Sequence, residues 1–283
     1  MQASYQQEPS SLPAMRVFVF GDVTLERRIA VTGPDARYER IPPDAWQGRS
    51  PALTLLKVLL CRPRRRAAKE DVVALIWSGT QLRNAGRACD AAASVLRSVL
   101  RPAGGESLLL TGHSGKHPWY RLADQRDLWV DADACDACVE RAIQAEGRGN
   151  VKEAISFWEE AFRLQQRGPF LEDDATAVWV RERRQLVEGN QRLCLHHLAD
   201  RYLADQRREE AEVLLRNALN IFPTDEDLLF RLLTLLAQQD RAQEALHLVT
   251  HAEYLFSQEE GRALSARIRV IAEQLRRKGT SGK

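Results

Sequence analysis

The sequence has few cysteines and no long hydrophobic run. Five cysteines, an odd number, are spread over 283 residues, which argues against a disulfide framework and favours a reducing compartment. No apolar run approaches the roughly 20 residues that a membrane-spanning helix needs. The first residues, MQASYQQEPSSLPA, have no basic start and no apolar core, so they do not resemble a signal peptide. These absences predict a cytoplasmic protein with a disordered lead-in over residues 1–15.

The sequence also lacks the short motifs that mark nucleotide binding or nucleophilic catalysis, since it has no P-loop, no GxGxxG and no GxSxG. His247 and His251 have the i, i+4 spacing of zinc proteases, but Leu248 stands where the glutamate of HExxH belongs. Cys135 and Cys138 have the spacing of half a zinc site or of a redox pair, or they fill a packed helix face. A structural zinc normally needs four protein ligands, and no second cysteine pair is present. The sequence therefore predicts no catalytic residue, no metal site and no cofactor.

Charge is distributed unevenly along the chain. The formal net charge is +2, but residues 16–124 carry a net charge of +8 and residues 125–283 a net charge of −5. A basic half joined to an acidic half indicates that only the first half meets a polyanion. The length predicts one or two domains.

The first half changes from strand-like to helical patterns and back. Alternating residues on either side of Gly21-Asp22 predict a strand pair, and residues 29–33 and 38–42 extend it to a small sheet. Helical periodicity follows over residues 52–61, 68–77 and 83–102. Two β-prone runs, SLLLTG and PWYRLA, then flank the polar tip HSGKH and predict a hairpin. Strands, three helices and a hairpin in this order indicate a winged helix-turn-helix, whose last helix before the hairpin enters the DNA major groove.

The predicted helix over residues 83–102 has two different faces. Its apolar face consists of Ala85, Ala88, Ala92, Val95, Leu96, Val99 and Leu100. Its polar face consists of Arg87, Asp90, Ser94, Arg97 and Arg101. The first set has the spacing of a face packed on a core. The second set is either a solvated face or the surface that contacts DNA.

The second half is helical throughout and repetitive. Glu210-Ala211 and Ala218 recur 34 residues later as Glu244-Ala245 and Ala252, which is the tetratricopeptide period. A further copy contains Glu153-Ala154 and Ala161, and is followed by an insert that includes GPFLEDD. Small alanines at fixed spacing allow paired helices to approach closely. The core of this helical domain is expected to contain Trp158, Phe170 and Trp179, and residues 259–283 are expected to supply a closing helix and tail.

These segments together resemble a known family. The strand-rich start, LTLLKVLLCRPRRRAAKEDVVALIW, DAAASVLRSVLRP and a wing ending in WYRL resemble the OmpR-type winged-helix domain. LWVDADACDACVERA, GPFLEDD and VWVRERR resemble the bacterial transcriptional activator domain. In this order they resemble the short, two-domain form of the Streptomyces antibiotic regulatory protein (SARP) family of transcription activators. The resemblance implies a mainly α fold with a small N-terminal β-sheet, a winged-helix domain over 16–124 and a tetratricopeptide-like domain over 125–258.

The resemblance also implies a function and a set of contacts. Such proteins bind double-stranded DNA at direct repeats near a promoter, as homodimers that contact RNA polymerase through the helical domain. The groove-facing positions of the recognition helix correspond to Arg87, Asp90, Ala91 and Ser94, and phosphate contacts to Arg97 and Arg101. Arginine can bind guanine O6 and N7 in a bidentate manner, and Asp90 either accepts from a cytosine amine or orients a neighbour.

Positions 92, 93 and 95 depart from the family pattern, because they are Ala, Ala and Val where relatives often carry polar or basic residues. This departure predicts fewer direct base contacts and a larger share for thymine methyl contacts and DNA shape.

Further contacts are expected outside the recognition helix. Backbone or wing contacts are predicted for Arg64, Arg65, Arg66, His113, Lys116 and His117. The alternative is that the three arginines form a solvated loop and that the loop histidines are incidental. A rival function is a tetratricopeptide-type adaptor whose winged helix binds protein or non-specific DNA. Salt dependence separates the two, because binding through several phosphate contacts weakens steeply with added salt.

Overall fold

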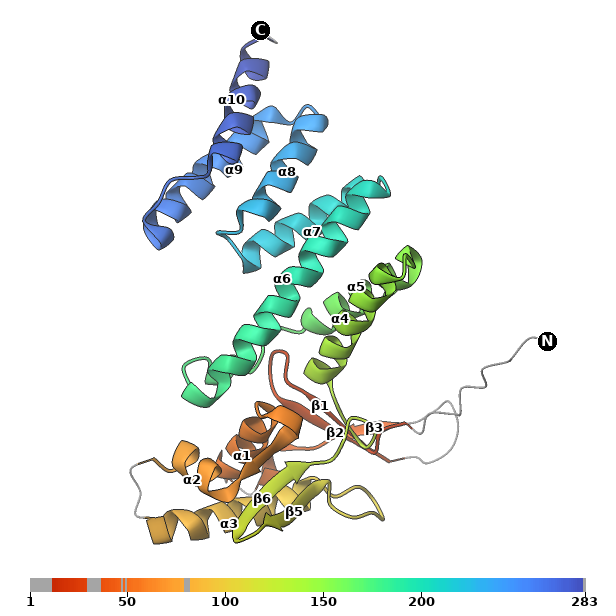
Figure 1. Cartoon of the computed structure of the whole chain (residues 1–283), viewed down its shortest axis with the longest axis vertical. Coiled ribbons are helices and arrows are strands. Elements are labelled where there is room, and N and C mark those ends of the chain that lie inside the picture. Colours follow the sequence, from red (N-terminus) through yellow and green to blue (C-terminus); the bar gives the residue numbers. More distant parts are fainter. Residues whose placement is uncertain (1–11, 30–36, 47, 49, 79–81, 282–283) are drawn as a thin grey trace, which may run out of the picture. The chain divides into compact units, whose positions relative to one another are not determined.

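The computed structural model describes residues 12–29, 37–46, 48, 50–78 and 82–281 of the chain (Figure 1). The chain divides into two compact units. Unit 1 takes its residues from 1–138 and 163–188, and unit 2 takes its residues from 139–162 and 189–283. Most of the predicted lead-in lies outside the described residues, as do residues 30–33 of the predicted sheet.

The secondary structure confirms a mainly α fold with small β-sheets in the first half. The strands are β1 (Met15–Phe18), β2 (Thr24–Arg28), β3 (Tyr38–Arg40), β4 (Arg66–Ala68), β5 (Leu109–Ser114), β6 (His117–Leu122) and β7 (Leu128–Val130). The helices of unit 1 are α1 (Ser50–Leu60), α2 (Lys69–Ile76) and α3 (Leu82–Val99). Both units share α4 (Asp131–Gly147), α5 (Val151–Gln165) and α6 (Arg181–Ala204). Unit 2 alone contains α7 (Arg208–Ile221), α8 (Glu226–Gln238), α9 (Ala242–Leu255) and α10 (Ala266–Ser281). The short 3-10 turns are η1 (Pro43–Trp46), η2 (Pro63–Arg65), η3 (Glu172–Asp174) and η4 (Val178–Val180), and η5 (Phe256–Glu260) is a π-helical turn.

The N-terminal sheet of unit 1 has the strand order β3-β2-β1-β7. Strand β1 pairs antiparallel with β2 and parallel with β7, which confirms the predicted strand pair on either side of Gly21. Met15 and Val17 are fully buried, whereas Arg16 and Phe18 are half-buried. Because side chains alternate between the faces of a strand, one face of the sheet covers the core and the other carries Arg16 and Phe18.

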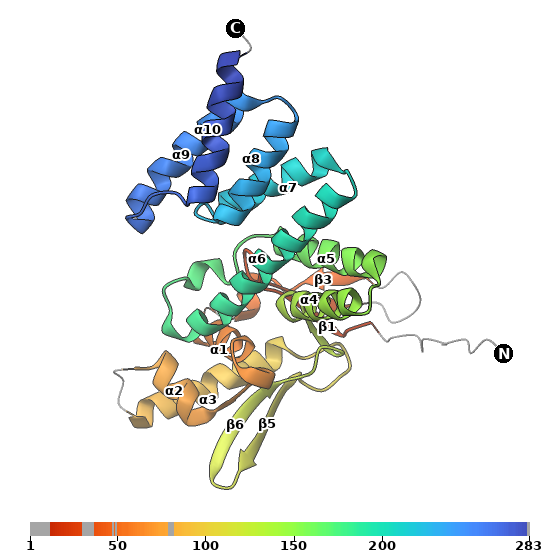
Figure 2. The same cartoon turned by 45° about the horizontal axis from the view of Figure 1, so that its top comes forward.

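The winged-helix part confirms the predicted order of three helices followed by a hairpin. Helix α1 is its centre, since Leu55, Leu56 and Leu59 have no exposed surface and α1 packs against both α2 and α3. Figure 2 shows the β5–β6 hairpin projecting from these helices as an arm. The structure adds a strand that the sequence did not predict, because β4 pairs antiparallel with β6 and makes the wing three-stranded.

The insert with GPFLEDD belongs to unit 1 and not to the helical repeats. Backbone hydrogen bonds join Gly21 N to Pro169 O (2.9 Å) and Leu171 N to Val19 O (2.9 Å), and the rings of Phe20 and Phe170 lie 6.3 Å apart. This corrects the expectation that Phe170 lies in the core of the helical domain, and unit 1 extends beyond the predicted boundary at residue 124.

The approach of the insert requires glycine at position 21. Gly21 has a φ of +71°, and a Cβ there would lie 2.4 Å from the carbonyl oxygen of Arg167. Glycine alone adopts this conformation at no steric cost, so any side chain would push the insert away.

Asp131, the first residue of α4, is hydrogen-bonded to the backbone that follows β1. Its buried carboxylate accepts hydrogen bonds from Val19 N (2.9 Å) and Phe20 N (3.2 Å). Burial raises the pKa of Asp131 to about 6, against the opposing effect of these backbone hydrogen bonds and of Arg167. Burial therefore exceeds the hydrogen bonds in its effect on this carboxyl.

This raised pKa predicts a pH dependence of stability. The folded state binds the Asp131 proton more tightly than the unfolded state does, so this residue adds stability as the pH falls from 7.5 to 5. The free energy of unfolding of wild type relative to Asp131→Asn should rise by about 1 kcal/mol over that range. Urea unfolding of both proteins at several pH values measures this difference, from which the titration of all other groups cancels. A difference that shrinks towards pH 5 would mean that the hydrogen bonds outweigh burial.

Unit 2 consists of paired helices with small residues at their contacts. Ala154, Ala161, Ala211, Ala218 and Ala245 have no exposed surface, which agrees with the close helix packing predicted from the recurring alanines. Helix α10, over most of the predicted C-terminal segment, packs against α8 and α9.

Trp158 lies in the core of unit 2, as predicted, and Trp179 is half-buried in unit 1. Trp158 is fully buried, stacks on the ring of His197 with centroids 4.6 Å apart, and donates to Glu146. His197 and the neighbouring charges lower the pKa of Glu146 despite its partial burial.

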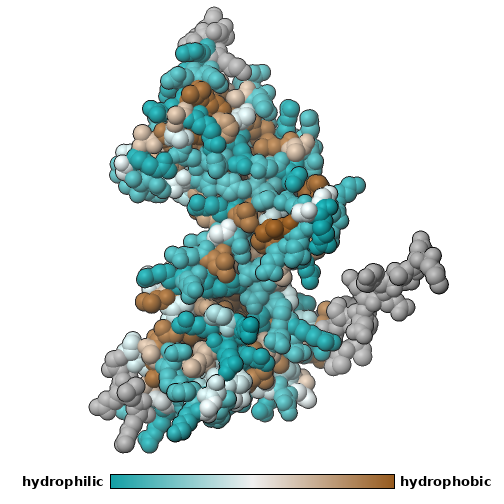
Figure 3. Space-filling view, in the orientation of Figure 1, coloured by the Kyte–Doolittle hydropathy of each residue, from teal (hydrophilic) through white to brown (hydrophobic). Residues whose placement is uncertain are grey.

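The face of the molecule shown in Figure 3 is mainly hydrophilic over its described residues. On the face shown in Figure 3, hydrophobic residues form small separate patches among hydrophilic ones. Among the described helices, none combines the length and the apolar character needed to cross a bilayer.

Candidate nucleic-acid interface

Helix α3 has the two faces that its periodicity predicts. Ala85, Ala92, Leu96 and Val99 are all buried, and the helix packs against α1. On the other face Arg87, Asp90, Ala91, Ser94 and Arg101 are exposed, and Arg97 is half-buried. Ser98 is also exposed and extends this face by one turn beyond Ser94. We call the exposed residues of α3, together with Arg101, the α3 face.

The family departure at positions 92, 93 and 95 has a structural explanation. Ala92, Ala93 and Val95 are 2%, 2% and 4% exposed, so they belong to the core and not to the α3 face. These three side chains offer no contact to DNA, and the expectation of fewer direct base contacts remains a prediction. Ala91 is the exposed alanine on this face, and its methyl group suits contact with a thymine methyl.

Asp90 is held by two neighbouring elements. It forms an ion pair with Lys69 of α2 (2.6 Å) and accepts a hydrogen bond from the Tyr120 hydroxyl of β6 (3.3 Å). Burial, followed by the effects of Cys89 and Asp90, raises the pKa of Tyr120, so its hydroxyl remains a donor at neutral pH. Asp90 thus connects α2, α3 and β6 while its side chain stays exposed, and its predicted role as an acceptor from cytosine remains a prediction.

The tip of the wing is a two-residue turn that presents a lysine. Ser114 pairs with His117, so Gly115 and Lys116 form the turn, and the φ of +63° at Gly115 fits the first central position of a type II′ turn. Lys116, His113 and His117 are all exposed. The ring nitrogen Nδ1 of His117 lies 3.6 Å from Glu70 of α2, and Lys116 supplies the cation at the tip.

The base of the wing is stiffened by an aromatic ring. Trp119 lies across Gly112, where an added Cβ would come within 2.3 Å of the indole. The guanidinium of Arg66 lies 4.4 Å from the centroid of the Trp119 ring. Arg66 is exposed, so this stacking positions a charged group on the surface of β4.

The three consecutive arginines before α2 have different environments. Arg64 and Arg66 are exposed, but Arg65 is 8% exposed. Arg64 and Arg65 both have positive φ values, 54° and 53°, and at this turn the Arg65 side chain is buried while Arg64 and Arg66 stay exposed. The prediction that all three contact phosphate is therefore corrected for Arg65.

The guanidinium of Arg65 is saturated by partners within unit 1. Nε donates to Asp133 (2.7 Å), and Nη1 donates to the carbonyl oxygens of Ala123 (3.0 Å) and Leu128 (2.8 Å). Nη2 contacts Asp133 and Gln125. All five N–H groups of the fork have acceptors, so none is left for a phosphate.

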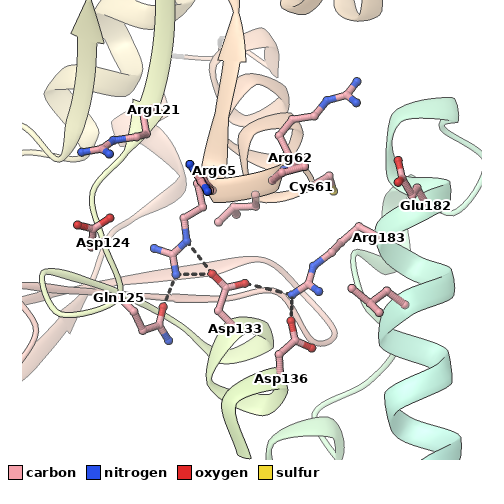
Figure 4. A pocket seen from close by; sticks show the side chains of 14 residues that line it. Cys61, Arg62, Arg65, Arg121, Asp124, Gln125, Asp133, Asp136, Glu182 and Arg183 are labelled. Carbon is pink, nitrogen blue, oxygen red and sulfur yellow. Dashed lines mark hydrogen bonds and ion pairs between the residues drawn. The ribbon is translucent and has the colours of Figure 1, made fainter. Parts of the chain in front are cut away.

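These contacts form the floor of a pocket of about 740 Å³ within unit 1 (Figure 4). Asp133 lies between Arg65 and Arg183, and Arg183 also pairs with Asp136 (2.6 Å). The two carboxylates in the centre of the pocket are thus neutralised by arginines. In Figure 4 the guanidinium of Arg62 points away from this centre. We interpret the network as scaffolding that joins α4 and α6 to the wing.

Cys61 and Cys135 do not have the properties of reactive thiols. Burial raises the pKa of Cys61 and of Cys135 to about 12, so both thiols stay protonated at neutral pH. Cys135 accepts a hydrogen bond from Gln165 (3.0 Å), which matches a residue of a packed helix face. His247 and His251 are exposed on α9, and the described residues contain no group of three or more potential metal ligands.

Sequence reasoning missed several supports of the interface. Lys69, Tyr120 and Trp119 act through contacts between elements, which no local pattern shows. Ser98 follows the i, i+4 spacing of Ser94 and was available from periodicity.

Comparison with known proteins places the second half in a family. The model of the bacterial transcriptional activator domain matches residues 130–276. This match covers more than half of the chain. No curated protein matches the sequence.

The fold also resembles a solved structure. Mycobacterium tuberculosis EmbR, in complex with a low-affinity phosphopeptide, matches with a TM-score of 0.71 at 19% sequence identity. The match covers 94% of this chain and 65% of that one, so this chain spans about two thirds of its length. At 19% identity this likeness shows a shared fold, and the shared fold extends over both units.

Proposed function

This chain belongs to the family of the bacterial transcriptional activator domain, and from that premise we propose that it activates transcription by binding specific sites on double-stranded DNA. The proposal places α3 in the major groove and the Lys116 turn on the adjacent backbone or minor groove. The protein would act in the cytoplasm, at the nucleoid.

The α3 face is the observation that carries this proposal. The buried side of helix α3 packs against α1, while Arg87, Ala91 and Ser94 are exposed at successive turns of the same helix. A rigid helix that presents an arginine, a methyl group and a hydroxyl has the chemistry needed to read base edges. Arg64, Arg66, Arg97, Arg101 and Lys116 supply cations for the phosphates on either side.

The partners follow from the same proposal. We infer that two protomers bind repeated half-sites, because one recognition helix reads only a few base pairs. The helical unit would contact RNA polymerase and the second protomer. The resemblance to SARP activators supports both inferences.

Salt dependence of duplex binding tests the proposal. Each of the three single variants Arg64→Gln, Arg66→Gln and Lys116→Gln should remove about one phosphate contact. Each variant should then reduce the slope of log K against log salt by about 1, for every protomer bound. Fluorescence anisotropy with a labelled duplex, measured at salt concentrations from about 50 to about 300 mM, gives the slope. Arg269→Gln, an exposed arginine of α10, should leave the slope unchanged.

The adaptor function makes the opposite prediction. If the winged helix binds protein and not DNA, the wild-type slope stays small, and the three glutamine variants bind duplex as Arg269→Gln does. If it binds DNA non-specifically, the slope stays steep but all duplexes bind with equal affinity.

A further inference from the structure

Unit 1 has a second concave site, on the outer face of its N-terminal sheet. A pocket of about 440 Å³ lies among residues of β1, β7 and the C-terminal end of α5, all of them within unit 1. Its walls include Arg16, Phe18, Trp129, Arg163, Leu164 and Arg167. Arg16 and Phe18 are on the face of β1 opposite to the buried Met15 and Val17. The sheet thus covers the core with one face and offers this pocket on the other.

The walls provide two aromatic surfaces at an angle. The rings of Phe18 and Trp129 lie 5.4 Å apart with an interplanar angle of 65°, and both side chains are half-buried. The parallel register of β1 and β7 pairs Arg16 with Trp129 along the backbone, and the guanidinium of Arg167 lies over the Phe18 ring of this corner. Such a corner accommodates a flat ring by edge-to-face or offset contact.

Three arginines line the pocket, and none of its described lining residues is acidic. The guanidinium of Arg167 lies 4.2 Å from the Phe18 ring centroid, and that of Arg16 lies 3.7 Å from the Tyr38 ring centroid. A stacked guanidinium is held in place by its face, while its N–H groups point outward in the plane of the group. That geometry suits the bidentate binding of a carboxylate or phosphate.

We propose that this pocket binds a small planar anion, an aromatic ring that carries a carboxylate or a phosphate. The volume of the pocket lies within the range of small-molecule sites. A pocket of this size is too small to hold a DNA duplex. Apolar walls together with a few oriented polar groups are the usual composition of such sites. The proposal goes beyond DNA binding, because it gives the protein a small ligand at a face built from β1 and β7 and not from α3.

Matched probes test the proposal on the full chain. Isothermal titration calorimetry would compare 2-naphthoate with 2-naphthamide, which has nearly the same shape and no charge. We expect 2-naphthoate to bind at least tenfold more tightly. Adenosine 5′-monophosphate is a third probe, and displacement of naphthoate by it identifies a nucleotide as the natural class, whereas failure to displace it identifies an aromatic carboxylate.

Variants locate the binding. Arg167→Gln changes an exposed side chain and should weaken naphthoate binding about tenfold, and Trp129→Leu should weaken it by a similar factor. Arg126→Gln, an exposed arginine of the same unit outside the pocket, should have no effect. Equal binding of naphthoate and naphthamide overturns the proposal. So does equal weakening by Arg126→Gln and Arg167→Gln, or the absence of binding by both anions at millimolar concentration. Naphthoate binding in this pocket is measured without DNA, so its outcome does not depend on whether the α3 face binds duplex. The DNA-binding proposal and the small-anion proposal can therefore fail independently.

Discussion

Replacement of Arg87 by alanine is expected to remove the preference for one base position within each half-site. Arg87 is exposed on the first turns of α3, and in the proposed complex its guanidinium reaches guanine O6 and N7. A bidentate contact of this kind contributes about 1–3 kcal/mol of discrimination, or roughly 5- to 150-fold in affinity at that position. Titration of Arg87→Ala against a preferred duplex and its single-base variants measures the loss.

The control separates base recognition from general charge. Arg269→Ala removes the same charge from α10 and should leave both affinity and base preference unchanged. If Arg87→Ala instead weakens all duplexes equally, Arg87 contacts phosphate and base recognition lies elsewhere on the α3 face.

Replacement of Arg65 by leucine is expected to destabilise unit 1 severely. The substitution leaves Asp133 without one of its two arginine partners, and leaves the carbonyl oxygens of Ala123 and Leu128 without these donors. Arg65 is buried, whereas Asp133 is half-buried and keeps Arg183, so the loss should lie at the lower end of the range of about 3–5 kcal/mol for breaking a buried ion pair. Urea unfolding followed by tryptophan fluorescence measures the loss.

The neighbouring arginine is the matched control. Arg64→Gln alters an exposed side chain, so it should change the free energy of unfolding by less than about 0.5 kcal/mol while it weakens duplex binding. An Arg65→Leu protein as stable as wild type, with the duplex affinity of Arg64→Gln, would contradict the structural role and restore the phosphate contact predicted from the sequence.

The order of elements and the faces of α3 could be predicted because local periodicity determines them. Ala85, Leu96 and Val99 recur at helical spacing and are buried, and Arg87 and Ser94 fall between them and are exposed. The alanine repeats of unit 2 were equally readable, since each repeat meets its neighbours through the same small residues.

The errors came from contacts between distant segments. The RRR run looks uniform, yet the backbone turn at Arg64 and Arg65 buries one guanidinium against residues about 60 positions away. The GPFLEDD insert lies between helical repeats in the sequence, but its backbone pairs with residues 19–21. Neither the short strand β4 nor the role of Asp131 has a local signature, because each depends on a partner strand or backbone far along the chain.

Selection of binding sites from a random duplex pool, with the full chain at about physiological salt, tests whether this protein recognises an operator. We expect a repeated motif with a defined spacing, bound at least about a thousandfold more tightly than unrelated duplex. The absence of a motif, with all duplexes bound only at non-specific affinities of about 10⁻⁴–10⁻⁶ M, would contradict recognition of an operator through the α3 face.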